Sequence, residues 1–461
     1  MCKLSFSIRS TNGWWTKVKS TQARDAWRRI GEKTIVVQTS SGSSNIQLTP
    51  KQQHYHDPEQ ACTFPVDLAM YPLVYGRTLV KDTTTGELRP IRDPQLSEDT
   101  YGLLTQNFSG IATPFSVSPS VLPLSVSALS YISGVPPSSK NLVAGIEELV
   151  AGTIPLFEHV LTDLSRDNPL FHRIPGEYQY TEWDEPEEPE HSDDEDGWLN
   201  YRNELQHWIH NRPIVYPDVP VAGYPGGLEH RHSRTSLRGT TVKVYTLVMD
   251  IKLRPDGPSY QGTPWRATGM RNEHVAAIAV HCLAVDNVTP LELNFRMPVR
   301  SPRKFHPGDA GATSRAWGLN AGAPSHQYIG STAIPLGHTV AYPNIYQCKE
   351  AEAHLVDPTK PGSMRVMFTF LVDPEMSADS EVPSTTNTPP QQIDWIREAL
   401  EENLDVRVPH EIVERIVDLT EGLMTEEEAL RFAVKMRFER QCFWAVHDQF
   451  WFSLPFNIWQ N

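Results

Sequence analysis

Residues 241–252 read TVKVYTLVMDIK, and residues 274–285 read HVAAIAVHCLAV. Both stretches are rich in β-branched and small apolar residues, and the first partly alternates between apolar and polar positions, as β-strands do. Further strands are expected at 291–296, 331–342 and 364–373, with Pro, Gly and Asn in the turns between them. Short strands in this arrangement predict an antiparallel sandwich or jelly roll.

Helical patterns flank these strands on both sides. Residues 141–164 keep an apolar stripe that Gly152 and Pro155 interrupt, and an amphipathic helix is expected within residues 14–29. Near the other end, Thr425-Glu-Glu-Glu428 matches a capping box opening a helix through Phe443. We therefore expect an α+β chain with helices and loops in 1–240, a double-stranded β-helix (jelly-roll, cupin-like) core in 241–375, and a helical extension packed on that core in 376–461.

Composition narrows the possible partners and the location. The chain has 461 residues and a formal net charge of −15, which argues against nucleic acid because phosphate binding needs clustered Lys and Arg. Residues 182–196 hold ten acids and no Lys or Arg, which is typical of an extended surface loop. No membrane span, secretory leader or CxxC motif is visible, so we expect reduced thiols in a cytoplasmic protein.

Short motifs spread over most of the chain carry a family resemblance. The most specific are Tyr342-Pro-Asn344, Asp357-Pro-Thr-Lys-Pro-Gly362, Leu371-Val-Asp-Pro374 and Pro389-Pro-Gln-Gln392 with Asp394-Trp395. Others are Trp14-Trp15, Trp27-Arg28, Ser130-Tyr-Ile132, Pro155-Leu-Phe-Glu158, Asn211-Arg-Pro213, Trp265 and Asn272-Glu-His274. With these segments the chain resembles a family of fungal proteins of unknown function, whose core is similar to the 2-oxoglutarate/Fe(II) oxygenases.

The resemblance implies three metal-ligand positions, and all three are substituted. Non-haem Fe(II) sites use two His and one carboxylate. The family pattern has His-x-Glu directly after the tryptophan equivalent to Trp265, where this chain has Arg266 and Thr268, and a His where it has Cys348. An arginine cannot ligate a cation, so we expect neither a metal nor a cofactor. The four histidines His274, His281, His338 and His354 stay open as substitute ligands, against the simpler view that they are structural or lie at the surface.

The resemblance also implies a deep pocket where the metal would lie. Its catalytic residues would be Arg266, Thr268 and Cys348, and its substrate-binding residues Tyr260, Trp265, Met270, His338, Tyr346 and Arg365. Arg365 would be shifted by one position from the family's co-substrate anchor, and one position along a strand turns a side chain to the other face. Such a pocket suits a hydrophobic small molecule, for example a terpenoid or polyketide.

The expected chemistry needs shape and hydrogen bonding but no redox centre. Proximity and a preorganised donor suffice for a pericyclase of the intramolecular Diels–Alder type in fungal secondary metabolism, and Arg266→Ala would then lower turnover in an intact fold. An isomerase or dehydratase would use His338 or Cys348, and Arg266 could activate Cys348 as a nucleophile by lowering its pKa. A non-catalytic binding protein and an oxygenase with unorthodox ligands stay open. An enzyme should keep an open pocket with an oriented Arg266, and a degenerate scaffold a filled one.

Overall fold

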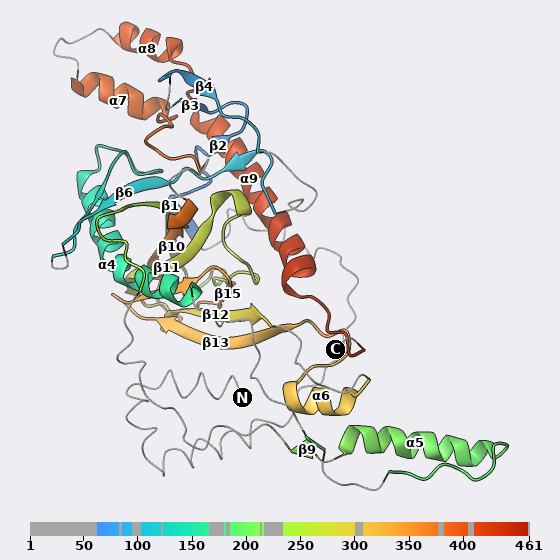
Figure 1. Cartoon of the computed structure of the whole chain (residues 1–461). Coiled ribbons are helices and arrows are strands. Elements are labelled where there is room, and N and C mark those ends of the chain that lie inside the picture. The colour runs from blue at the N-terminus through green and yellow to red at the C-terminus, as the bar shows by residue number, and fades with distance from the viewer. Residues whose placement is uncertain are drawn as a thin grey trace.

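The computed structural model describes residues 62–82, 85–94, 103–120, 123–165, 179–180, 185–212, 214–215, 234–299, 308–376, 382–403 and 410–459. The helix expected within residues 14–29 lies outside this part of the chain. The described residues form two main antiparallel sheets and three two-stranded ones, with helices packed around the main sheets (Figure 1).

The larger sheet has seven strands, and three long strands form its centre. In the middle lies β16 (Gly362–Val372), between β10 (Thr241–Leu253) and β11 (Val275–Asp286), and it is antiparallel to both. β11 also pairs with β14 (Thr339–Pro343), whereas β10 pairs with β6 (Thr113–Val117) and β1 (Cys62–Val66), and β6 pairs with β7 (Val126–Ala128). These long strands match the expected ones closely.

A three-stranded sheet faces the larger one and shares its core. Its order is β13 (His326–Ile334), β12 (Leu291–Pro298) and β15 (Gln347–Glu350). Alternate residues of β16 show the two sides: Met364, Val366, Phe368 and Phe370 pack between the sheets, whereas Met367 and Leu371 pack on the outer side. We call the two sheets and the side chains enclosed between them the β core. The predicted mixture of helices with an antiparallel core is confirmed, and its double-stranded β-helix arrangement stays a prediction.

The outer face of the larger sheet is covered by α4 (Lys140–Leu164), which was expected from the apolar stripe. Pro155 lies inside this helix without ending it. Beneath the helix, the buried His281 of β11 contacts hydroxyl groups of Thr153 in α4, Thr339 in β14 and Thr369 in β16. This histidine therefore belongs to the packing between helix and sheet.

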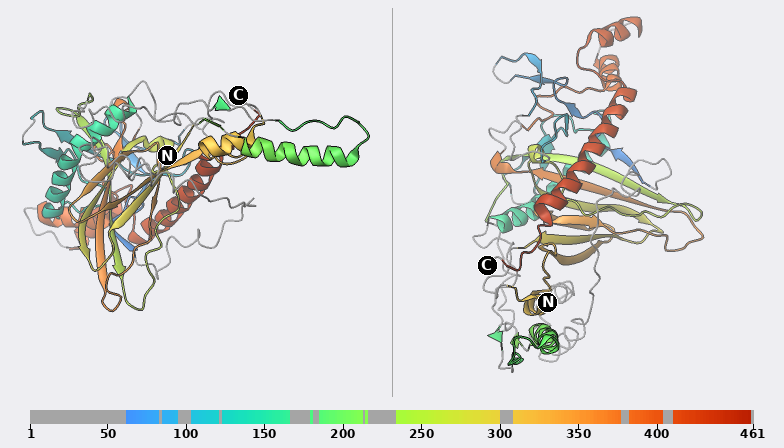
Figure 2. Two further views of the ribbon diagram at one scale, coloured as in Figure 1. Left: turned by 90° about the horizontal axis from the view of Figure 1, so that it is seen from below. Right: turned by 90° about the vertical axis from the view of Figure 1, so that its right-hand side faces the viewer.

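The C-terminal part is helical, as expected, with α7 (Ile393–Asn403), α8 (His410–Leu419) and α9 (Glu426–His447), followed by a π-helical turn, η6 (Asp448–Phe452). The hydroxyl of Thr425 accepts a hydrogen bond from the amide of Glu428 at 3.2 Å, so the helix begins at the expected cap. α9 runs diagonally along the β core from α7 and α8 toward β12 and β13 (Figures 1 and 2).

Three expectations about organisation differ from the structure. The strand expected at 331–342 is two strands, β13 and β14, because Pro335 and Gly337 (φ 73°) form a turn between them. The sheet also begins well before residue 241, since β1, β6 and β7 join it; these strands are too short to show a clear alternation. The acidic run ends inside a helix, α5 (Glu195–Asn211), whose N-terminal residues are acidic, as the helix dipole favours.

The remaining elements are short and lie around the two sheets. They are β2 (Leu73–Val74), β3 (Leu79–Lys81), β4 (Leu88–Pro90), β5 (Phe108–Ser109), β8 (Gln179–Tyr180), β9 (Ile214–Val215), α6 (Ala310–Trp317), η4 (Arg271–Glu273) and η5 (Pro374–Met376). α5 projects from the molecule next to α6 (Figure 2). None of the helices described has the length and apolar character needed to span a bilayer.

Candidate functional site

Arg266 and Cys348, which are far apart in sequence, lie directly opposite each other. The amide of Arg266 donates to the carbonyl of Cys348 at 3.0 Å, and the amide of Cys348 donates back to the carbonyl of Arg266 at 2.9 Å. This antiparallel bridge joins the segment after Trp265 to β15. The structure thus brings together two of the residues that the sequence placed in one site.

The guanidinium of Arg266 points to a carboxylate that the sequence did not single out. Its Nη2 lies 2.5 Å from Oε1 of Glu350, and the two side chains are 17% and 3% exposed. The hydroxyl of Tyr260 donates to the other oxygen of the same carboxylate, and the ring of Trp444 in α9 lies 5.3 Å from the guanidinium carbon. Arg266 is therefore part of an enclosed ion pair.

Cys348 is buried beside this ion pair and contacts the hydroxyl of Tyr342. Burial, and then the negative charge of Glu350, raise the pKa of its thiol to about 12, although Arg266 acts in the opposite direction. Arg266 lowers the pKa of the thiol, as expected, but burial and Glu350 outweigh this one already paired cation, so the thiolate is disfavoured. We call Tyr260, Arg266, Tyr342, Cys348 and Glu350 the inner cluster.

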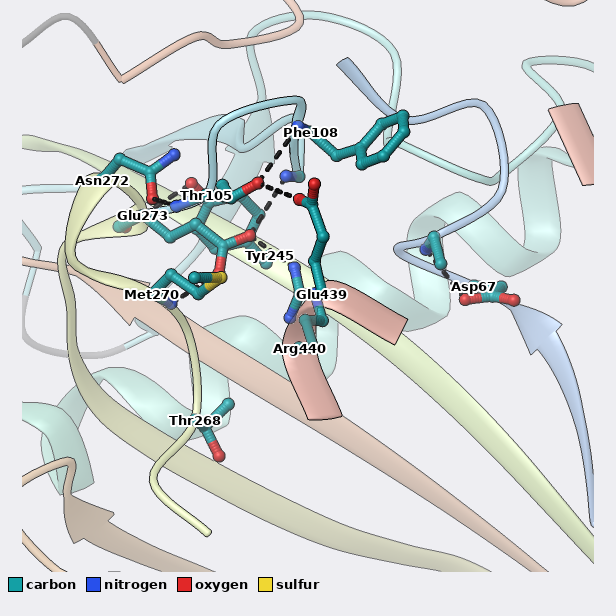
Figure 3. A network of polar contacts seen from close by, with 12 residues as sticks. Asp67, Thr105, Phe108, Tyr245, Thr268, Met270, Asn272, Glu273, Glu439 and Arg440 are labelled. Atoms are coloured by element: carbon teal, nitrogen blue, oxygen red, sulfur yellow. Dashed lines mark hydrogen bonds and ion pairs between the residues drawn. The ribbon is translucent and has the colours of Figure 1, made fainter. Parts of the chain in front are cut away.

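Thr268 and Met270 lie on the segment that leads from the inner cluster to the rim of the β core. The side chain of Asn344 fixes this segment, accepting from the amide of Thr268 at 3.1 Å and donating to the carbonyls of Thr268 and Val275 at 2.6 and 2.9 Å. Thr268 is partly exposed, and Met270 is buried. In Figure 3, Thr268 lies apart from the polar network around Glu273.

That network ties the rim to α9 (Figure 3). Glu273, only 2% exposed, accepts from the amides of Gly110 at 3.1 Å and Met270 at 2.9 Å, and its carboxylate lies 2.5 Å from Nη2 of Arg440. The neighbouring Glu439 of α9 accepts from the hydroxyl of Thr105. Because the Glu273 carboxylate is fully engaged, it holds the turn before β11 in one conformation.

A cavity of about 350 Å³ lies at this rim, and we call it the rim cavity. Its walls come from the segment around Gly269, the start of β11, the end of β16 and the C-terminal turns of α9; they comprise Leu103, Ala267, Gly269, Met270, Arg271, His274, Val275, Ala276, Asn344, Asp373, Phe443 and His447. Met270 alone among the predicted site residues belongs to this wall. The inner cluster does not line it.

His274 has an unusual backbone conformation at this cavity. It is a non-glycine residue in the left-handed region, with φ 48° and ψ 41°. Its amide donates to the carbonyl of Arg271 at 3.2 Å, and its carbonyl accepts from the amide of Asp373 at 2.8 Å. Burial, and to a lesser degree Arg271, lower the pKa of its imidazole, whereas Asp373 raises it.

The other predicted site residues lie elsewhere. Trp265 packs against Arg296, whose guanidinium carbon is 4.8 Å from its ring, and Tyr346 packs edge-on against Phe295 of the β core. His338 is exposed in the turn between β13 and β14. Arg365 lies opposite Asp250 on the outer face of the larger sheet and pairs with it at 2.6 Å, so it faces away from the β core.

No group of three His, Cys, Asp or Glu side chains in the described ranges is placed to hold a metal ion. His281 is enclosed under α4, and His354 is an exposed residue near Glu352, so neither approaches the inner cluster. The sequence reasoning missed Glu350, which stands two positions after Cys348 and therefore shares its face of β15. That period-two spacing is the signal that could have found it.

The family comparison covers most of the chain. The model of DUF4246, a family described as "Protein of unknown function", matches residues 36–399. The chain therefore belongs to the DUF4246 family, and the predicted membership of a family of unknown function is confirmed. A search of curated protein sequences finds no match. Trp444, Phe443 and His447 lie beyond the matched residues.

Solved structures resemble parts of the chain at low TM-scores. The Fe(II)/α-ketoglutarate-dependent dioxygenase TqaL matches with a TM-score of 0.21 and 10% identity over 41% of this chain and 57% of its own. IDO from Bacillus thuringiensis matches with 0.19 and 7% identity over 29% and 47%. A bsmA homolog from Methylobium petroleophilum PM1 matches with 0.24 and 11% identity over 63% and 78%. The chain thus spans 57% and 47% of the first two proteins, and scores this low carry no argument about activity.

Proposed function

We propose that this chain is a metal- and cofactor-independent enzyme of the cyclase or isomerase class, built on an oxygenase-type scaffold of fungal secondary metabolism. The observation that supports a substrate is the rim cavity of about 350 Å³. The Arg266–Glu350 ion pair, at 2.5 Å, supports the part of the proposal that concerns the metal. The family resemblance assigns Arg266 to a metal-ligand position, and a guanidinium there repels a cation and engages the nearest carboxylate. By that resemblance, the ion pair lies where the family pattern would hold a metal.

The side chains at the three substituted positions do not fit Fe(II). Arg266 is cationic, and Thr268 offers one hydroxyl. Burial raises the pKa of the Cys348 thiol to about 12, which disfavours the thiolate that metal ligation needs. Glu350, which could serve as a replacement, already accepts hydrogen bonds from Arg266 and Tyr260. No step of the proposed chemistry therefore involves iron.

The rim cavity supports a small-molecule substrate. Its volume, about 350 Å³, is within the range of ligand pockets, and apolar side chains such as Leu103, Met270 and Phe443 share its wall with polar ones. Holding a flexible terpenoid or polyketide in a folded conformation lowers the barrier of an intramolecular cyclisation by proximity. The most specific form of the proposal is a pericyclase of the Diels–Alder type that works in the cytoplasm.

One observation favours a second candidate, a non-catalytic binding protein. A pericyclase that uses Arg266 needs its guanidinium to be available to a substrate carbonyl. Arg266 instead donates to Glu350 and lies under Trp444, so its hydrogen-bonding direction is already taken. An Arg266 engaged in an ion pair is what a scaffold that has lost its chemistry would show, and such a protein would bind small molecules at the rim without turning them over.

The first experiment measures the iron content of the purified full-length chain after anaerobic incubation with Fe(II) and 2-oxoglutarate. We expect no stoichiometric iron. The matched control is the triple variant Arg266→His, Thr268→Glu, Cys348→His, which restores the ligand types of the family pattern and should retain more iron than the wild-type chain. Stoichiometric iron in the wild-type chain would overturn the proposal and revive the oxygenase with unorthodox ligands.

The second experiment separates the enzyme from the binding protein. The metal-free chain is incubated with terpenoid and polyketide precursors that carry a diene and a dienophile, and binding is followed by calorimetry while products are followed by mass spectrometry and chromatography. Cyclised or isomerised products above the uncatalysed rate support the enzyme. Binding without any product supports the non-catalytic alternative.

A further inference from the structure

The rim cavity brings together ionisable groups from three separate elements. His274 and Arg271 come from the turn before β11, Asp373 follows β16, and His447 ends α9. The register of β11 and β16 pairs Val275 with Val372, so His274 and Asp373 are neighbours across the two strands. These groups share the cavity with apolar side chains of Leu103, Met270 and Phe443.

The backbone of His274 is held in place by the fold. A non-glycine residue in the left-handed region costs about 1 kcal/mol, and such conformations concentrate at functional sites. Here both backbone polar groups of His274 are engaged, with Arg271 on one side and Asp373 on the other. The turn is further fixed by Glu273, whose carboxylate binds Arg440, and by Asn344, which binds the carbonyl of Val275. The backbone that carries the His274 side chain at the cavity wall is thus held in one conformation.

The surroundings of the imidazole suit proton transfer. His274 is half-buried, and the burial that lowers its pKa keeps it neutral, and hence able to accept a proton, at neutral pH. Asp373, the negative charge of the cavity wall, favours the imidazolium once a proton has been taken up. Arg271 supplies a positive charge, and His447, whose pKa is also lowered by burial, supplies a second neutral imidazole.

We propose that the rim cavity binds a largely apolar, enolisable carbonyl compound and that His274 moves a proton on it. This inference rests on the proposed function, since it names the substrate class and the reacting group of an isomerase. The imidazole takes the proton from the carbon between the carbonyl and a β,γ double bond, and the C–H electron pair forms an enolate, whose oxygen lies toward Arg271. The same proton returns to the γ carbon, and the double bond moves into conjugation, so no oxidant or further reactant is consumed.

The inner cluster offers no comparable group. Burial raises the pKa of the Cys348 thiol and so disfavours its thiolate, and Arg266 and Glu350 pair with each other. In the wall of the rim cavity, the side chain of Asn344 is engaged as well, since its amide donates to the carbonyls of Thr268 and Val275. Among the residues that line the cavity, His274 alone combines a half-buried imidazole, a left-handed backbone and a carboxylate across the strand.

The test uses the metal-free full chain with two probes, a monocyclic and a bicyclic β,γ-unsaturated ketone, and follows formation of the conjugated isomer by absorbance. We expect the wild-type chain to accelerate the isomerisation and His274→Asn to lose about 100-fold or more, the usual contribution of a positioned general base. Asparagine tolerates the left-handed conformation, so this variant should fold. His191→Asn, which changes an exposed histidine in a loop far from the β core in sequence, is the matched control and should keep the wild-type rate.

The pH profile gives a second reading that a purely structural role would not affect. The rate should rise as His274 loses its proton, with an apparent pKa below the ordinary histidine value of 6.5, and Asp373→Asn should move that pKa lower still. No acceleration of either ketone, or an unchanged rate in folded His274→Asn, would overturn the inference. Iron-free cyclisation of terpenoid precursors would still support the proposed function in that case, so the two failures are distinguishable.

Discussion

The inner cluster and the rim cavity use similar polar side chains in opposite ways. In the inner cluster, Arg266 and Glu350 lie within 2.5 Å of each other and are 17% and 3% exposed. At the rim cavity, the half-buried His274 and Asp373 border an open space of about 350 Å³. Groups that are enclosed and matched in charge specify one packing of the core, whereas groups that border a cavity are available to a ligand. The two regions should therefore respond differently to substitution.

The largest effect is expected from breaking the inner ion pair. Glu350→Ala leaves the guanidinium of Arg266 enclosed without its carboxylate and removes the acceptor of the Tyr260 hydroxyl. Removing one partner of a buried ion pair costs about 3–5 kcal/mol of unfolding free energy. Arg266→Ala should destabilise the chain by a similar amount, because the carboxylate of Glu350 is the more buried of the two groups. Unfolding in guanidinium chloride measures both.

The double variant Arg266→Met, Glu350→Leu is the control for this prediction. Replacing a buried ion pair by apolar side chains of similar volume is often close to neutral. If the double variant is far more stable than either single variant, the pair acts as a coupled unit inside the core. Single variants with wild-type stability would instead show that water reaches the pair, and the distinction between the two regions would fail. The sequence analysis expected Arg266→Ala to leave the fold intact. The enclosed ion pair instead predicts that this variant is destabilised.

The second prediction concerns His281, another enclosed polar group. Burial lowers its pKa from 6.5 to about 4. Between pH 6.5 and 4 the imidazole is therefore protonated in the unfolded state but neutral in the folded state. The contribution of His281 to the free energy of unfolding is complete above pH 6.5 and decreases as the pH falls toward 4. At about 1.36 kcal/mol per pKa unit, this single group accounts for a loss of about 3 kcal/mol over that range.

Denaturant unfolding at several pH values checks this prediction. His281→Gln keeps a hydrogen-bonding side chain among the threonine hydroxyls and should reduce the dependence on pH, while His338→Gln should leave it unchanged. Half-buried histidines whose pKa is also lowered by burial, such as His447, keep part of the dependence on pH. An identical slope in His281→Gln and the wild-type chain would show that His281 is not the group responsible.

The strands and helices that were predictable are those with a long periodic pattern. β10, β11 and β16 each bury one or both faces over many residues, and α4 and the start of α9 carry an apolar stripe and a cap. β1, β6 and β7 were not predicted, because a strand of five residues or fewer shows no clear period. β1 and β6 are placed by pairing with the distant β10, and β7 by pairing with β6. Tertiary contacts, rather than propensity, select such strands.

Of the candidate site, the sequence predicted only that Arg266 and Cys348 lie close together. Because the motif around Trp265 and the one around Asn344 could be aligned to a family pattern, the proximity of Arg266 and Cys348 followed. Glu350 and Trp444 could not be assigned as partners of Arg266, since a side chain's partners depend on facing elements, and α9 lies beyond the family match. The orientation of Arg365 depends on a single step of register, which the structure resolves toward Asp250 on the outer face.

The smallest effect on stability is expected at the rim cavity. The imidazole of His274 makes no hydrogen bond with the side chains of the described residues, and its backbone conformation suits asparagine, so His274→Asn should change the unfolding free energy by less than about 1 kcal/mol. The unfolding free energies of His274→Asn and Glu350→Ala, measured under the same conditions, compare the rim cavity directly with the inner cluster. A loss as large as that of Glu350→Ala would place His274 among the enclosed groups that maintain the fold. A small loss with the expected fall in isomerisation rate would separate the residue that acts on a ligand from those that hold the core together.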